Sequence, residues 1–154
     1  QRIATITKRH DIIDAVVNSH TSSIPEQLKA AKVLSAVSES EEFKGITEAL
    51  NRVINISAKA QDDASGEILE DRLETASERT FVKAIQELNA KVGSLTPEEL
   101  YSHLEAMAPK INDFFNENMV MVDDEATRRN RLRFLGLLSE IILDFADFTS
   151  LIVK

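Results

Sequence analysis

The sequence contains no cysteine and no tryptophan, and it has only 4 glycines and 3 prolines in 154 residues. Without cysteine the chain forms no disulfide and no thiolate metal site, which fits a reducing compartment. No apolar run approaches the roughly 18 residues that a membrane-spanning helix needs, and the N-terminus does not resemble a signal peptide. We therefore expect a soluble, cytoplasmic domain with no membrane partner.

The scarcity of glycine and proline leaves room for long helices. Apolar residues recur at three- and four-residue spacing through most of the chain, which is the period of amphipathic helices. We predict one all-α bundle domain, residues 1–154, of about seven helices. Because the chain begins with Gln1 and not Met, we expect a fragment of a longer protein. The predicted helices cover about residues 3–18, 25–37, 41–60, 76–92, 97–107, 109–118 and 124–147.

The break between two of these helices is predicted at Pro109, because proline clashes with the preceding turn of a continuous helix. Other boundaries have positive signals. Thr96-Pro97-Glu98-Glu99 is a capping box with proline at the first helical position, and Asp123 or Asp124 can cap the last helix. Residues 61–74 are acidic and lack a helical period, so they are predicted to form a surface connection.

The net charge of -8 argues against a protein that binds nucleic acid without selectivity, because such affinity comes mainly from Lys and Arg on phosphates. The sequence also offers no candidate catalytic centre and no metal site. Its three histidines, His10, His20 and His103, are scattered, and the paired Glu-x-x-His motifs of di-iron bundles do not occur. A phosphate-binding glycine-rich loop and a cysteine nucleophile are absent as well.

Four arginines fall within six residues at the start of the last predicted helix. On a helical wheel Arg131 lies in the middle of the apolar face and Arg128 at its edge, whereas Arg129 and Arg133 point the other way. A guanidinium on an apolar face requires a carboxylate partner. We therefore predict structural ion pairs of Arg128 and Arg131 with Asp123 and Asp124, and we expect Arg131→Ala to cost roughly 2 kcal/mol or more.

The helix predicted over residues 41–60 has the opposite character. Its apolar residues gather on one side, and the other side carries polar residues suited to RNA: Lys44, Asn51, Arg52, Asn55 and Lys59. Arg and Asn hydrogen-bond base edges, while Lys suits phosphate. Spacing alone does not distinguish an RNA-binding face from an ordinary solvated helix face. Arg52→Ala is expected to change stability by no more than about 0.5 kcal/mol.

Three segments together resemble the C-terminal region of the bacterial-type glycyl-tRNA synthetase beta subunit. They are DIIDAVV (residues 11–17), NRVINISAK (residues 51–59) and a long C-terminal signature. The signature consists of Phe114, Phe115, the MVMV run at residues 119–122, Asp123, Asp124, Glu125, Arg128, Asn130, Arg131, Leu132, Ala146 and Asp147. These segments keep the family's order and spacing over essentially the whole chain.

The resemblance implies an all-helical anticodon-binding domain, similar to the one in arginyl-tRNA synthetases, that docks on the anticodon arm of glycine tRNA. It implies an RNA contact through Arg52 and Asn55, which match family positions. It also implies partners in the rest of the beta subunit and in the alpha subunit. Aminoacylation would take place in the alpha subunit with ATP, and Mg²⁺, so that this fragment needs no cofactor of its own and has no DNA partner.

An acidic helical module that docks on another protein without binding RNA is the alternative. Titration with glycine tRNA at several salt concentrations separates the two, because only RNA binding predicts an affinity that falls with salt and depends on the anticodon.

Overall fold

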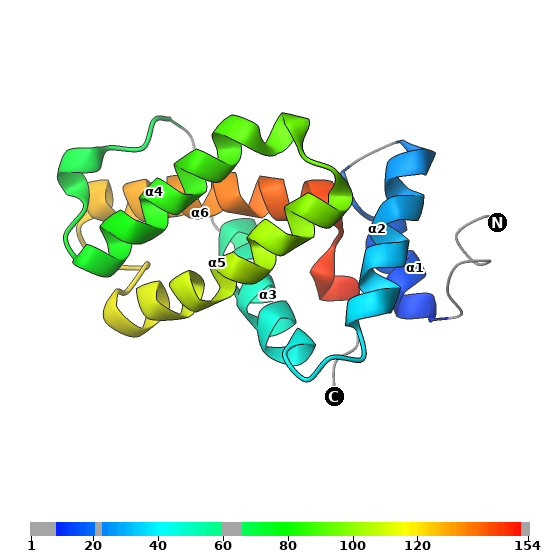
Figure 1. Ribbon diagram of the computed structural model, residues 1–154. Coiled ribbons are helices and arrows are strands. Elements are labelled where there is room, and N and C mark those ends of the chain that lie inside the picture. Colours follow the sequence, from blue (N-terminus) through cyan, green and yellow to red (C-terminus); the bar gives the residue numbers. More distant parts are fainter. Residues whose placement is uncertain (1–8, 21–22, 60–65, 152–154) are drawn as a thin grey trace.

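The computed structural model describes residues 9–20, 23–59 and 66–151, and these residues form six α-helices and no β-strand (Figure 1). The all-α prediction is confirmed. Residues 3–8 of the first predicted helix lie outside the described part of the chain. The helices are α1 (His10–Val17), α2 (Ile24–Val37), α3 (Phe43–Lys59), α4 (Ala76–Lys91), α5 (Pro97–Glu117) and α6 (Glu125–Phe145), with the short 3-10 turns η3 (Glu70–Arg72), η4 (Val92–Ser94) and η5 (Phe148–Ser150).

Polar side chains begin α5 and α6 where the sequence predicted. Thr96 accepts a hydrogen bond from the backbone N–H of Glu99 at 3.2 Å, and the Glu99 carboxylate accepts one from the backbone N–H of Thr96 at 2.9 Å. Asp124 accepts from the backbone N–H of Thr127 at 3.1 Å. These bonds satisfy N–H groups that have no partner within the helix, so both helix starts are confirmed.

The predicted break at Pro109 is wrong, because α5 continues through it to Glu117. The apolar face of α5 keeps its register across the proline, with Leu104 and Met107 buried before it and Ile111 and Phe114 buried after it. The proline itself is exposed. Packing of one continuous buried face therefore outweighs the lost hydrogen bond, and six helices form where about seven were expected.

The core centres on α3, α4, α5 and α6, and buried residues of α1 and α2 extend it at one end of the molecule beside η5 (Figure 1). Phe81 of α4, Phe114 of α5 and Phe134 of α6 have no exposed surface, and their ring centroids lie 5.0 to 5.9 Å apart. Edge-on packing of such rings adds to the apolar area that they bury. This cluster fixes the end of α5 against α4 and α6, next to both polar sites described below.

Candidate nucleic-acid interface

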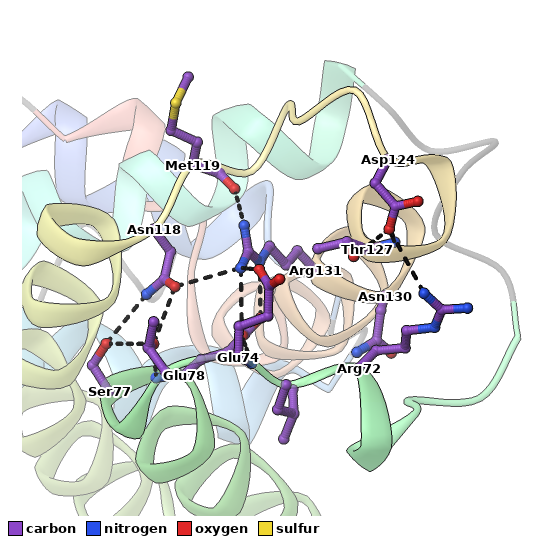
Figure 2. A network of polar contacts seen from close by, with 12 residues as sticks. Arg72, Glu74, Ser77, Glu78, Asn118, Met119, Asp124, Thr127, Asn130 and Arg131 are labelled. Carbon is purple, nitrogen blue, oxygen red and sulfur yellow. Dashed lines mark hydrogen bonds and ion pairs between the residues drawn. The ribbon is translucent and has the colours of Figure 1, made fainter.

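Arg131 of α6 is the centre of a buried polar network (Figure 2). Its side chain is 3% exposed, and its guanidinium donates to Glu78 at 2.8 Å and to Glu74 at 2.7 Å. A third hydrogen bond goes to the carbonyl oxygen of Met119, and the side chain of Asn118 completes the ring of acceptors. Because Glu78 has no exposed surface, this guanidinium neutralises a carboxylate that is wholly removed from water. Arg131 is therefore part of the scaffold.

Asp123 and Asp124 were predicted to form ion pairs with Arg131, and these contacts show that this prediction is wrong. Within the described residues neither aspartate forms an ion pair with Arg131; the carboxylates come from α4 and the segment before it. Asp124 lies seven residues before Arg131, about 10 Å along the helix axis, and it is committed to the helix start. Local sequence proximity suggested the wrong partners because the packing of α4 against α6 decides which carboxylates come close.

Asp124 instead holds the start of α6. The hydroxyl and the backbone N–H of Thr127 both donate to its carboxylate, at 2.5 and 3.1 Å, and these bonds lower the pKa of Asp124. Arg72 of η3 lies 3.7 Å away, and the charges of Arg72 and Arg128 act in the same direction. Arg128 is half-buried and donates to the carbonyl oxygen of Val122 at 3.2 Å. Arg128 thus also serves the structure around the helix start.

Two further side chains of α6 bind the connection that leads from α3 to α4. Asn130 has no exposed surface, accepts from the backbone N–H of Leu69 at 2.6 Å and donates to the carbonyl oxygen of Leu69 at 2.9 Å. Arg133 donates to the carbonyl oxygen of Glu67 at 3.1 Å. Gly66 has a φ of 105°, and a Cβ there would lie 3.1 Å from the Arg133 guanidinium. Only glycine suits this turn and this close approach.

The connection was predicted as a surface segment, and its described part contains the short turn η3. Its attachment to α6 was not predicted. Asn130 stands among Arg128, Arg129 and Arg131 in the sequence, so nothing local indicated that its amide would be buried and would require backbone partners.

The outer face of α3 differs from α6, because its polar side chains do not hold another described segment by such hydrogen bonds or ion pairs. Lys44, Arg52, Asn55 and Lys59 are exposed on it, whereas Asn51 is half-buried at its edge and its side-chain oxygen is covered without a hydrogen-bond partner among the described residues. Their contact with RNA stays a prediction. We call these five residues the α3 polar face.

Arg52 stands out among the arginines. Each of the other arginines in the described part of the chain forms hydrogen bonds or ion pairs, with carboxylates or with backbone carbonyl oxygens. Arg52 forms neither with any described residue; instead its guanidinium carbon lies 4.2 Å above the centre of the Phe115 ring. Its hydrogen-bond donors are therefore available to a ligand.

In the sequence Phe115 belongs to the family signature together with Phe114, and no role was predicted for it. Its neighbour Phe114 is buried in the core, whereas Phe115 is half-buried and turns toward α3, with the two ring centroids 5.2 Å apart. The stack of Arg52 on Phe115 joins the outside of α3 to the last turn of α5. Arg52 and Phe115 lie on different helices, so no local pattern in the sequence indicates this contact.

Comparison with known proteins places the chain in a family. A model of the DALR anticodon binding domain matches residues 46–146, which include most of α3 and all of α4, α5 and α6. This chain belongs to the DALR anticodon-binding domain family. The resemblance stated from the sequence motifs is confirmed.

Three relatives of this domain are glycine–tRNA ligase beta subunits. The chain is 38% identical over 146 residues to the glycine–tRNA ligase beta subunit of Lacticaseibacillus casei, and 38% identical over 144 residues to that of Streptococcus pyogenes serotype M18. The beta subunit of Ligilactobacillus salivarius is 33% identical over 147 residues. Each alignment covers 94 to 95% of this chain but only 20 to 21% of the relative, so the chain spans about a fifth of the length of these subunits.

Other kinds of site find little support in the described residues. Three or more His, Asp or Glu side chains do not gather there in an arrangement that could hold a metal ion. His10 lies in α1, His20 follows it and His103 lies in α5. In the described ranges, no helix combines the length and apolar character that crossing a membrane would require.

Proposed function

We propose that this chain is the anticodon-binding domain of a glycine–tRNA ligase beta subunit and that it docks on the anticodon arm of glycine tRNA through the α3 polar face. Membership of the DALR family and the likeness to beta subunits support the class of ligand. Aminoacylation would take place outside this domain, in the alpha subunit with ATP and Mg²⁺, in the cytoplasm. The remaining part of the beta subunit would connect the domain to that subunit.

The observation that carries the choice of surface is the state of Arg52. Its guanidinium is exposed, has no carboxylate partner among the described residues and is held in place by an aromatic ring. A preoriented cation loses less conformational freedom when it binds than a freely rotating one. Asn55 lies on the same exposed side one turn further along α3, and it offers an amide donor and acceptor to a base edge.

Charge around this surface also limits the affinity. Glu48 is exposed one turn before Arg52 on the same helix, and the whole chain carries a net charge of -8. Few phosphates can be neutralised here, so we expect binding in the micromolar range or weaker and a shallow dependence on salt.

Titration of the 154-residue chain with the anticodon stem-loop of glycine tRNA tests this function. Arg52→Ala is expected to weaken binding roughly tenfold, or about 1.4 kcal/mol. The matched control is Arg129→Ala, which removes another exposed arginine, on α6, where it pairs with Glu125 at 2.7 Å. That variant should bind almost as the parent does. Glu48→Gln should bind more tightly, because it removes the negative charge beside Arg52.

A protein-docking module without RNA binding predicts different results. The parent chain would then show no affinity for the stem-loop at low salt, and changing the anticodon would have no effect. Equal weakening by Arg52→Ala and Arg129→Ala would mean that general charge, and not the α3 polar face, governs binding.

A further inference from the structure

The guanidinium of Arg52 has two flat sides in different surroundings. The guanidinium carbon lies over the Phe115 ring, 4.2 Å from its centre, so the ring lies to one side of the cation while the side chain as a whole stays exposed. The ring holds the guanidinium in one place, because Phe115 lies next to Phe114, which is anchored in the core. The outer side of a fixed, planar cation is therefore presented to solvent.

Such a plane is a recognised surface for a nucleobase. Guanidinium groups are weakly hydrated and stack on flat π-systems, and proteins that bind single-stranded RNA stack unpaired bases on aromatic rings or on arginine. A lysine ammonium in the same place would supply charge but no plane. The shape of this site thus favours an unpaired base over a phosphate alone.

The rest of the α3 polar face is arranged in a way that suits a short single strand. Asn55 lies three residues beyond Arg52 and can reach the edge of a base stacked there. Lys44 and Lys59 lie eight residues before and seven residues after Arg52, about 12 and 10 Å along the helix. They are placed to meet phosphates on either side of the stacked nucleotide.

From this geometry we infer that an unpaired base of the RNA loop stacks on the outer side of the Arg52 guanidinium and completes a three-layer stack of Phe115, Arg52 and base, with Asn55 at the base edge. This inference rests on the proposed function and adds to it the chemical feature that is recognised. Phe115 contributes as a positioning residue, since it holds the guanidinium plane without touching the base.

Two substitutions separate the plane of Arg52 from its charge. Arg52→Lys keeps the positive charge, and Phe115→Leu keeps an apolar side chain but removes the ring. The RNA is the anticodon stem-loop with a fluorescent base analogue placed at each loop position in turn, because stacking quenches such an analogue. The chain has no tryptophan, so protein emission does not interfere.

We expect one loop position to be quenched by the parent chain. Arg52→Lys should weaken binding about tenfold and abolish the quenching at saturating protein, while the slope of affinity against salt stays the same. Phe115→Leu should weaken binding several-fold, again with an unchanged slope. Lys44→Ala should instead reduce the slope by about one, because it removes a phosphate contact. Arg129→Lys serves as the control outside the surface and should match the parent.

Other outcomes overturn the inference in distinguishable ways. If the parent chain binds and Arg52→Lys retains both its affinity and its quenching, the stack is refuted while the proposed function stands. Absence of any binding by the parent chain at low salt refutes the proposed function and the stack together. Should Phe115→Leu fail to fold, Arg52→Lys still decides the question, because Arg52 lies on the exposed surface.

Discussion

The replacement Arg131→Met tests the assignment of the α6 arginines most directly. Methionine fills much of the space of the arginine but leaves Glu78, which has no exposed surface, without the cation that lies 2.8 Å away. The carbonyl oxygen of Met119 loses its donor as well. Breaking a buried ion pair from one side costs about 3–5 kcal/mol, which is a large part of the roughly 5–15 kcal/mol that stabilises a typical domain. The buried network therefore raises the expectation above the roughly 2 kcal/mol predicted from the sequence for Arg131→Ala.

Urea denaturation followed by far-ultraviolet circular dichroism measures this loss, which should lower the midpoint by more than about 1 M. A second variant, Arg131→Met with Glu78→Gln, tests the cause. Glutamine keeps an acceptor for the backbone N–H of Glu74, which lies 2.6 Å from Glu78, but it carries no charge. The double variant should recover roughly 2 kcal/mol relative to Arg131→Met.

The matched control is Arg129→Met on the same helix, because Arg129 is exposed and pairs with Glu125 at the surface. It should cost less than about 1 kcal/mol. If Arg131→Met costs no more than this control, or if adding Glu78→Gln brings no recovery, the stranded carboxylate is not the origin of the stability and the reasoning fails.

Three further changes have defined outcomes. Asn130→Ala removes both hydrogen bonds to Leu69 and should cost roughly 1–3 kcal/mol, with faster hydrogen exchange at the Leu69 amide. Burial raises the pKa of Tyr101 to about 12, and its hydroxyl has no hydrogen-bond partner among the described residues. Since the folded pKa lies above the unfolded value near 10, stability should fall as the pH rises from about 10 to 12, and Tyr101→Phe should abolish this loss. Pro109→Ala should stabilise the protein by roughly 1–2 kcal/mol, because it supplies an N–H within α5 and removes a steric clash.

Each of these has a clear contrary result. Unchanged exchange at Leu69 would show that α6 does not hold the connection. Tyr101 is the chain's single tyrosine, so absorbance of tyrosinate at high pH reports it alone, and titration near 10 would contradict its burial. A loss of stability in Pro109→Ala would mean that the proline is required where it stands.

Arg52→Ala should cost about 0.5–1 kcal/mol of stability, slightly more than its exposed position suggested, because it gives up the contact with the Phe115 ring.

The sequence determined the local structure of this protein. Helix period placed Arg131 inward and Arg52 outward, and the side chains of Thr96 and Asp124 specified where α5 and α6 begin. Such features depend on residues within a few positions of one another, and a single helix already expresses them. The family signature around Arg131 could be recognised for the same reason. The structural role of Arg131 was only partly predicted, because its carboxylate partners were not.

Tertiary structure decided which groups meet. Arg131 and Glu78 are 53 residues apart in the chain, and they pair because α4 packs on α6, whereas the nearby Asp123 and Asp124 form no ion pair with Arg131 among the described residues. In the same way Phe115 lies beneath Arg52 because α5 packs against α3. Periodicity fixes the direction of a side chain from its helix, but it contains no information on which other helix lies in that direction. That choice is made when the apolar faces of distant segments are buried together.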